Sequence, residues 1–199
     1  MSHIANLDEI WLLGEYRDIA SRDADTVLDL GANVGCASLY LRSKFPHARI
    51  VAVEPDPANA ELLRRNTRSA DVHVVQAAIG AVPGVTSFEQ SHESWGSRVG
   101  GDSSDSIVVS VVTPDSVLRA VGTDPNDTLV VKVDIEGSEW SLFESGPIFG
   151  SWNPVEIYGE THDWGAPDDQ EQFWAEAGQR LGLTSVSLKD RVHLKRTTL

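Results

Sequence analysis

A glycine-rich stretch directly after a short apolar run carries residue types that could bind a charged cofactor. It reads Asp29-Leu30-Gly31-Ala32-Asn33-Val34-Gly35 and follows Thr26-Val27-Leu28. A strand that ends in a glycine turn brings backbone amides close to a ligand, and a helix that begins there adds the positive end of its dipole. Such a site suits a carboxylate or a phosphate, so we expect an enzyme that uses a cofactor.

Acidic residues near this turn narrow the choice of cofactor. Asp29 is expected to project toward the ligand and accept from an ammonium group, which S-adenosylmethionine has and a nicotinamide dinucleotide lacks. Glu54 lies 19 residues after Gly35, where a carboxylate can accept both hydroxyls of a ribose. The glycine spacing is G-x-x-x-G rather than the dinucleotide pattern G-x-G-x-x-G. The residues favour S-adenosylmethionine, although each has a plain alternative as a turn, a helix cap or a solvated charge.

The remaining cofactor contacts are expected farther along the chain. The adenine should lie near Gln76, Ala77 and Ala78, after a third strand, where backbone groups would recognise it. Trp95 lies in a polar loop over residues 92–106 and either stacks on the adenine or a sugar face or anchors the loop. The full predicted cofactor site comprises Asp29, Gly31, Asn33, Gly35, Glu54, Pro55, Gln76, Ala77, Ala78 and Trp95.

The elements that must position these residues alternate between strands and helices. Strands are expected over residues 26–30, 48–53, 72–76, 85–88, 108–112, 128–134, 155–160, 183–188 and 191–195. Helices are expected over residues 7–20, 34–44, 58–68, 115–121, 138–144 and 168–181. This order predicts an α/β fold with an antiparallel edge, in which the carboxyl ends of the parallel strands converge on the ligand. We expect one domain over residues 1–199, with an N-terminal helical segment over 1–22 and a Rossmann-like core over 26–199.

Composition limits the classes of partner and the compartment. The formal net charge is −14 with a pI near 4.7, which disfavours nucleic acid and anionic membranes as partners. The single cysteine, Cys36, fits a reducing compartment. The first eight residues lack the basic start and apolar core of a signal peptide. We therefore expect a soluble, cytoplasmic protein, with its oligomeric state left open.

Four segments together resemble the FkbM family of S-adenosylmethionine-dependent methyltransferases. They are the glycine stretch, Glu54-Pro55, Ala78-Ile79-Gly80 and the block Lys132-Val133-Asp134-Ile135-Glu136-Gly137-Ser138-Glu139. The resemblance covers residues 27–160, and the K-x-D-x-E-G-x-E block is its most specific part. It implies a class I methyltransferase fold, a Rossmann-like three-layer sandwich with a mostly parallel seven-stranded sheet and an antiparallel C-terminal hairpin. It also implies S-adenosylmethionine as cofactor and O-methylation of a hydroxyl on a sugar or natural product.

Methyl transfer to oxygen requires a group that removes the acceptor proton. Asp134, at the end of a central strand, is the first candidate to orient or deprotonate the hydroxyl. Lys132 shares the sheet face of Asp134 and is either a catalytic lysine or part of a buried ion pair with Asp134 or Glu160. Dipole stabilisation and amide capping at a helix start explain Glu136 and Glu139 without catalysis, but the resemblance adds Glu136 to the catalytic candidates. Asp134, Lys132 and Glu136 form the core of the predicted catalytic site.

A histidine after the next strand offers another base. His162 would be a better base than a carboxylate if its imidazole is neutral near pH 7, although a lone loop histidine is often plain surface. Asp134 and Glu160 could instead bind a divalent cation as hard oxygen ligands. No further convincing ligand is found in the sequence, so no metal site is predicted. A nicotinamide-dependent oxidoreductase and a non-catalytic cofactor-binding protein remain as alternative functions.

Overall fold

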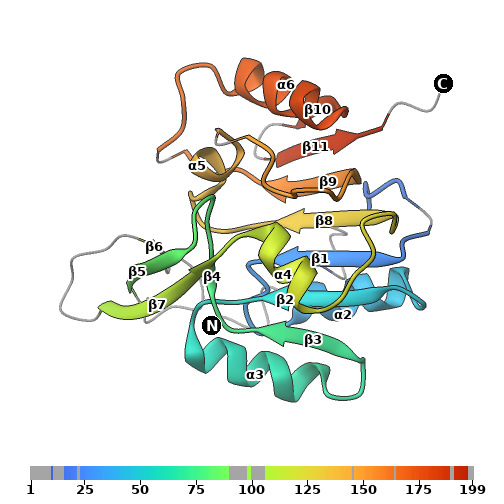
Figure 1. Cartoon of the computed structure of the whole chain (residues 1–199), viewed down its shortest axis with the longest axis vertical. Helices are drawn as coiled ribbons and strands as arrows, with labels where there is room; N and C mark the ends of the chain where they lie inside the picture. The colour runs from blue at the N-terminus through green and yellow to red at the C-terminus, as the bar shows by residue number, and fades with distance from the viewer. Residues whose placement is uncertain are drawn as a thin grey trace.

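The main sheet has seven strands in the order β10-β11-β9-β8-β1-β2-β3 (Figure 1). The computed structural model describes residues 10, 16–21, 23–89, 98–99, 106–144, 146–163, 165–188 and 191–196. The strands are β1 (Thr26–Leu30), β2 (Arg49–Val53), β3 (Val72–Val75), β8 (Leu129–Val133), β9 (Pro154–Glu160), β10 (Thr184–Leu188) and β11 (Arg191–Lys195). Neighbours from β3 to β9 are parallel, whereas β11 is antiparallel to both β9 and β10. The expected seven-stranded sheet with an antiparallel C-terminal hairpin is confirmed.

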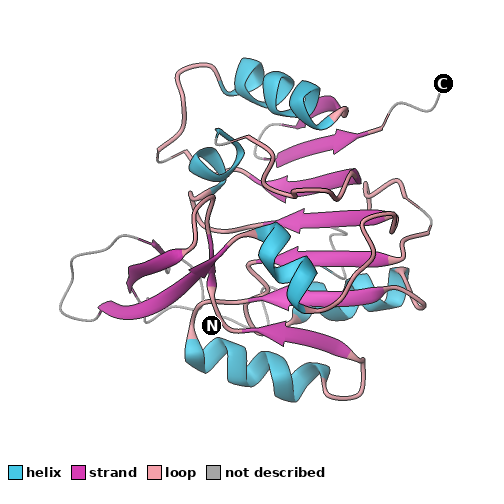
Figure 2. Ribbon diagram, in the orientation of Figure 1, coloured by secondary structure: helices cyan, strands magenta, loops and turns pink. Residues whose placement is uncertain are grey.

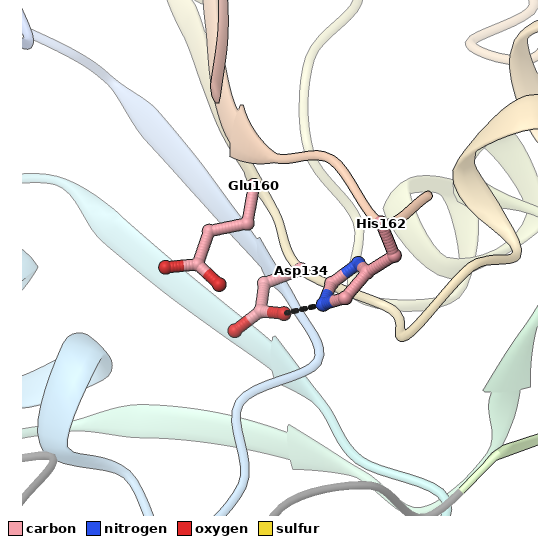
Figure 3. Close-up of side chains that lie close together, drawn as sticks. All are labelled: Asp134, Glu160 and His162. Carbon is pink, nitrogen blue, oxygen red and sulfur yellow. Dashed lines mark ion pairs between the residues drawn. The ribbon is translucent and has the colours of Figure 1, made fainter. Parts of the chain in front are cut away.

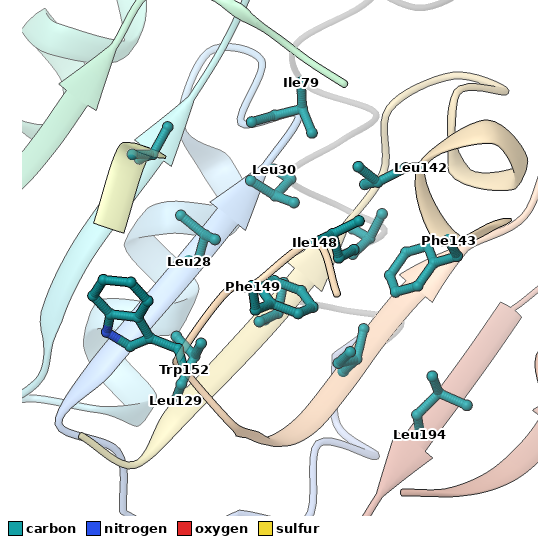
Figure 4. Packing of buried hydrophobic residues seen from close by; sticks show 14 of the residues in the cluster. Leu28, Leu30, Ile79, Leu129, Leu142, Phe143, Ile148, Phe149, Trp152 and Leu194 are labelled. Atoms are coloured by element: carbon teal, nitrogen blue, oxygen red, sulfur yellow. The ribbon is translucent and has the colours of Figure 1, made fainter. Parts of the chain in front are cut away.

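Alternation along the central strands divides the core between the two faces of the sheet. Leu28 and Leu30 of β1 pack into one apolar cluster, whereas Val27 packs into a second. Figure 4 shows part of the first cluster, in which Leu28 and Leu30 lie with Leu129 and Trp152. Every position of β1 and β8 is buried, as expected for central strands covered on both faces. The sheet is therefore the middle layer of a three-layer sandwich.

Helices on the two faces bury these clusters (Figure 2). They are α2 (Cys36–Lys44), α3 (Pro57–Thr67), α4 (Pro114–Ala120), α5 (Glu139–Glu144) and α6 (Gln170–Leu181). The first cluster takes Val117 from α4, Phe143 from α5 and Trp174 from α6. The second takes Leu41 from α2, and α3 adds Leu63 against the neighbouring part of the sheet. No helix in the described part of the chain is long and apolar enough to cross a bilayer.

A second, four-stranded sheet lies beside the main one. Its order is β4-β7-β5-β6, formed by β4 (Ala78–Ile79), β7 (Ser106–Val112), β5 (Gly84–Glu89) and β6 (Arg98–Val99). The sequence predicts β5 and β7 as strands but not β4 or β6. The expected loop over 92–106 is wrong at Arg98–Val99 and at Ser106, which begins β7, and its other residues lie outside those described. The ladders that define these short strands join distant segments, which a local pattern does not reveal.

The N-terminal segment is attached to the C-terminal half of the main sheet. Backbone amides of Ala20 and Ser21 donate to the carboxylate of Glu156 at 2.6 and 2.7 Å. The expected helix over residues 7–20 lies largely outside the described residues, and it is wrong at residues 16–18, which form a turn. Buried side chains of Tyr16 and Ile19 still join the second cluster. Burial of apolar groups here is consistent with the amphipathic pattern of the segment.

Candidate active site

The carboxyl ends of four parallel strands meet at one edge of the main sheet. Leu30 of β1 is in register with Val53 of β2 and with Val133 of β8, and Val133 is in register with Gly159 of β9. The next residues along each strand therefore lie side by side at this edge, where open α/β sheets bind their ligands. They include Gly31, Glu54, Asp134 and Glu160. The structure thus brings together the segments that the sequence singled out.

The two glycines of the loop after β1 are required by contacts within the protein. Gly31 has φ +77°, and a Cβ there would lie 1.6 Å from the backbone oxygen of Asp134. Gly35 has φ +95°, and its Cβ would lie 2.7 Å from Leu63 Cδ1 on α3. Any larger residue would collide or adopt a strained backbone. The sequence explained these glycines by approach to a ligand, but the structure accounts for them by approach of β8 and α3.

Glu54 connects the glycine loop to the end of β2. Its carboxylate accepts hydrogen bonds from the backbone amides of Asn33 at 2.8 Å and Asp56 at 2.9 Å. Burial raises the pKa of Glu54 to about 7, although the two amide hydrogen bonds act to lower it. Each carboxylate oxygen has a further lone pair that a ribose hydroxyl could use. Glu54 therefore supports the loop, and its carboxylate keeps acceptor capacity beyond these two amides.

Asp29 has different neighbours from those expected. It is fully buried, and its carboxylate accepts from Ser38 Oγ at 2.6 Å and lies 3.2 Å from Lys132 Nζ. The expectation that Asp29 projects toward the ligand is wrong, because strand alternation turns it to the α2 face of the sheet, opposite Leu28 and Leu30. Asp29 and Lys132 are direct cross-strand partners in the β1–β8 register. Asp29 therefore supports the loop indirectly, through Lys132, which donates to the Gly31 oxygen.

Lys132 links the glycine loop to Asp134. Its Nζ donates to the backbone oxygen of Gly31 at 2.5 Å and lies 3.6 Å from Asp134 Oδ2. The side chain is almost completely buried, so its charge needs these partners. Of the two interpretations of Lys132, the structure favours the buried ion pair, made with Asp29 and Asp134. This lysine is a positioning residue.

His162 lies among carboxylates at the edge of the sheet (Figure 3). Its Nδ1 is within hydrogen-bond distance of Glu139 Oε1, at 3.1 Å. Its Nε2 lies 3.4 Å from Glu136 Oε2 and 4.0 Å from Asp134 Oδ1. Trp140 Nε1 donates to the backbone oxygen of His162 at 2.9 Å and fixes the chain there. His162 is thus a partly buried member of this group of carboxylates rather than a plain surface residue.

The neighbours of His162 disfavour the neutral imidazole that a base near pH 7 would need. Burial alone would lower the pKa of His162, but the hydrogen bond and charge of Glu139, with the charges of Asp134 and Glu136, raise it to about 9. A protonated imidazole cannot accept another proton. Asp134 is therefore the better candidate for the base.

Glu139 is the site residue that sequence reasoning missed. It is fully buried, and its Oε1 accepts from the amide of Ile135 at 2.9 Å as well as facing His162. The sequence explained Glu139 by helix capping and dipole effects, whereas Glu136 was a catalytic candidate. The available signal was its place as the last acidic residue of the K-x-D-x-E-G-x-E block. Glu136 itself is partly exposed in a turn with φ +52°.

The expected adenine contacts lie near Glu54. The Ala77 amide donates to the backbone oxygen of Glu54 at 3.1 Å, and Ala77 and Ala78 are buried, whereas Gln76 is exposed. Pro55 follows Glu54 at the end of β2. Trp95 lies outside the described residues.

The sheet order, the antiparallel hairpin, the glycine loop after β1 and the acidic residue after β2 define a Rossmann-like class I methyltransferase fold. Residues 29–181 match the family model described as the methyltransferase FkbM domain, and the chain belongs to this family. Membership of a methyltransferase family implies S-adenosylmethionine as the cofactor.

Individual relatives match this chain over limited regions. Methyltransferase sdnD of Sordaria araneosa is 44% identical over 50 residues, which cover 25% of this chain and 19% of that protein. Methyltransferase 1 of Beauveria bassiana is 38% identical over 55 residues, covering 28% of this chain and 22% of that protein. The crystal structure of the methyltransferase FkbM from Methylobacillus flagellatus has a TM-score of 0.57 at 14% identity, covering 94% of this chain and 47% of that one. The matches thus cover less than half the length of each of these relatives.

Proposed function

We propose that this protein is an O-methyltransferase that transfers the methyl group of S-adenosylmethionine to a hydroxyl of a small molecule, a sugar or a natural product. The observation that carries the proposal is the position of Asp134. Its amide donates to the Leu30 oxygen at 3.0 Å, directly before the glycine loop, and its carboxylate is partly exposed beside Lys132 and His162. A carboxylate that adjoins a cofactor loop and remains accessible is placed to receive an acceptor group.

The residues around the loop fit the proposed cofactor. Glu54 presents a buried carboxylate suited to ribose hydroxyls. Gly35 caps α2 without a side-chain hydrogen bond, so the first amides of this helix can meet the carboxylate of the cofactor. When bound, S-adenosylmethionine supplies a methyl group activated by the neighbouring sulfonium. These features support binding at this edge of the sheet.

The chain's own residues would prepare the acceptor. Asp134 can accept a hydrogen bond from the hydroxyl and hold its proton, while Lys132 restrains the carboxylate through Oδ2. The formal net charge of −14 argues against polyanionic acceptors such as nucleic acid. A neutral hydroxylated small molecule agrees with both features.

Two alternative functions differ in their support. The nicotinamide-dependent oxidoreductase loses its support, because the family is one of methyltransferases and the G-x-G-x-x-G pattern is absent from the sequence. The non-catalytic cofactor-binding protein differs from the proposal only in turnover. A direct measurement of turnover is therefore needed.

Calorimetry with S-adenosylhomocysteine and with NADH tests the cofactor. We expect binding of the first and none of the second, and the reverse outcome would refute the proposal. A panel of hydroxylated sugars and natural products with radiolabelled S-adenosylmethionine then tests the reaction. Label that appears in a base-stable ether product supports O-methylation, whereas label found only on nitrogen or carbon would contradict it.

A further inference from the structure

Three side chains at the carboxyl edge of the sheet lie close enough to share one cation (Figure 3). Asp134 follows β8, Glu160 ends β9, and His162 comes two residues later. One ligand atom from each, two carboxylate oxygens and a ring nitrogen, all lie within 4.8 Å of one another. Ligand atoms bound at about 2.1 Å in an octahedral site lie about 3 to 4.2 Å apart. A small contraction of the three side chains would therefore complete one face of such a site.

The backbone holds these side chains in place. Val133 and Gly159 are paired in the β8–β9 register, so that Asp134 and Glu160 follow at equivalent positions. A Cβ at Gly159 would lie 2.4 Å from the Val133 oxygen, which shows how closely the two strands approach. His162 is held by the hydrogen bond from Trp140. The cluster is thus built on strand ends rather than on a long loop.

The orientation of His162 is a separate indication of a metal ligand. Its Nδ1 faces Glu139 Oε1 at 3.1 Å, and its Nε2 lies 3.4 Å from Glu136 Oε2 and 4.0 Å from Asp134 Oδ1. A histidine that binds a metal through one ring nitrogen almost always donates the other N–H to a carboxylate or carbonyl oxygen. Glu139 is fully buried and is itself held by the Ile135 amide at 2.9 Å. Glu139 therefore fixes the His162 ring so that its Nε2 faces the carboxylates of Glu136 and Asp134.

The charges around the cluster favour a divalent ion. Asp134, Glu136 and Glu139 surround His162, and Glu160 adds another carboxylate to the cluster. Lys132 lies at Asp134 Oδ2, whereas Oδ1 faces the histidine. Two hard oxygen ligands suit Mg²⁺ or Mn²⁺, and the single imidazole favours the transition metal of the two, Mn²⁺.

We propose that Asp134, Glu160 and His162 bind one divalent cation of the Mg²⁺ or Mn²⁺ class, with Glu139 as the residue that orients His162. The remaining coordination positions of the ion would bind oxygen atoms of the acceptor, a role that rests on the proposed function. A cation lowers the pKa of a bound hydroxyl, which compensates for the weak basicity of a carboxylate toward an alcohol. The substrates best suited to this site are hydroxylated molecules with a second oxygen near the methylated one.

Binding of Mn²⁺ to the full chain tests the site without any turnover. We expect calorimetry and the loss of the free-ion electron paramagnetic resonance signal to show one bound Mn²⁺ per chain. Asp134→Asn and Glu160→Gln should each weaken it by more than tenfold, and Glu139→Gln by about 10- to 100-fold as an orienting residue. Asp163→Asn is the matched control, because Asp163 is an exposed carboxylate next to His162, and it should bind Mn²⁺ as the wild type does.

Failure of this proposal can be distinguished from failure of the proposed function. Absence of Mn²⁺ binding, or equal binding by the wild type and the Asp134 and Glu160 variants, would overturn the metal site. S-adenosylhomocysteine binding by the same samples reports on folding and on the cofactor site separately. If Mn²⁺ binds as expected but S-adenosylhomocysteine does not, the metal site stands and the methyltransferase proposal fails. If S-adenosylhomocysteine binds but Mn²⁺ does not, the metal-site proposal fails and the methyltransferase proposal stands.

Discussion

Two glutamate–histidine pairs lie in different regions of the main sheet. His162 and Glu139 meet at the carboxyl edge at 3.1 Å, where the histidine side chain is 21% exposed. His193 of β11 and Glu156 of β9 meet at 2.5 Å inside the sheet, where the histidine side chain is 5% exposed. The same two residue types therefore form one pair that is partly exposed to solvent and one that is buried.

The partners of each pair explain the difference. The Glu156 carboxylate accepts hydrogen bonds from the amides of Ala20 and Ser21 and contacts His193 Nε2. It therefore anchors the N-terminal segment to the sheet. His162 instead directs its second ring nitrogen toward the carboxylates of Glu136 and Asp134. Backbone amides hold the glutamate in both pairs, so the pairs differ in the surroundings of the histidine, which is buried at His193 and partly exposed at His162. A titratable pair is available for chemistry when one ring nitrogen faces an accessible site.

The largest expected effect concerns Asp134, which lies beside the partly exposed His162 at the carboxyl edge of the sheet. Asp134→Ala should lower turnover by about 10²- to 10⁴-fold, the usual contribution of an acid–base group. S-adenosylhomocysteine affinity should stay close to that of the wild type, because Glu54 and the loop amides remain. Steady-state kinetics and calorimetry on the same preparation measure both quantities. An affinity loss as large as the turnover loss would mean that Asp134 serves the cofactor site instead.

Removal of the Glu156 carboxylate, in the buried pair with His193, should affect folding rather than chemistry. Glu156→Ala leaves His193 and two amides without their acceptor, so the free energy of unfolding should fall by about 3–5 kcal/mol. Urea unfolding measures this change, and turnover of the folded protein at low temperature should be retained. Glu61→Ala, an exposed position on α3, is the control and should stay within about 0.5 kcal/mol of wild type. Equal stability of the two variants would contradict the anchoring role.

The same pair predicts a specific loss of stability in acid. Burial alone would raise the pKa of Glu156, but hydrogen bonds from His193, Ser21 and Ala20 lower it from 4.5 to about 2. A carboxylate with a depressed folded-state pKa stabilises the fold fully above its unfolded pKa. This stabilisation, about 3 kcal/mol, is lost as the pH falls from about 4.5 to about 2. Urea unfolding across this range should show the loss in wild type, and a profile in Glu156→Gln as steep as that of wild type would refute the assignment.

Glu54 is a buried carboxylate that is held by backbone amides and has no histidine partner among the described hydrogen bonds. Hydrogen bonds to charged groups contribute about 1.5–3 kcal/mol each, so Glu54→Ala should weaken S-adenosylhomocysteine binding by about tenfold or more. Calorimetry measures this loss, and turnover at saturating cofactor should fall less than in Asp134→Ala. Unchanged affinity in Glu54→Ala would show that this carboxylate only supports the loop.

The most gradual expected effect is a pH dependence of cofactor affinity. Because burial raises the pKa of Glu54 to about 7, the residue is partly protonated near neutral pH and must lose its proton to accept two hydroxyls. Affinity should therefore fall as the pH drops below about 7, by up to about tenfold per pH unit. Glu54→Gln should remove this dependence in calorimetric titrations. A wild-type affinity that is constant from pH 6 to pH 8 would contradict the ionised-acceptor role of Glu54.

Local patterns predicted the main sheet well because their causes are local. The unbroken apolar runs of β1 and β8 required burial on both faces, and Asp56 with Pro57 marked the start of α3, where the Asp56 side chain caps the helix. The second sheet was predicted only in part, because β4 and β6 are two residues long and exist only through ladders with distant strands.

By itself, the sequence determined the fold class, the family and the chemical groups at the site, since the glycine loop and the K-x-D-x-E-G-x-E block are contiguous motifs. Only the tertiary structure decided where those groups point. Strand register placed Asp29 opposite Lys132, so that Asp29 is buried in an ion pair and Lys132 joins it to Asp134. A contact across 23 residues joined Glu139 to His162 and raised the pKa of the histidine. These outcomes depend on strand pairing and on electrostatics between distant segments, which no local residue pattern contains.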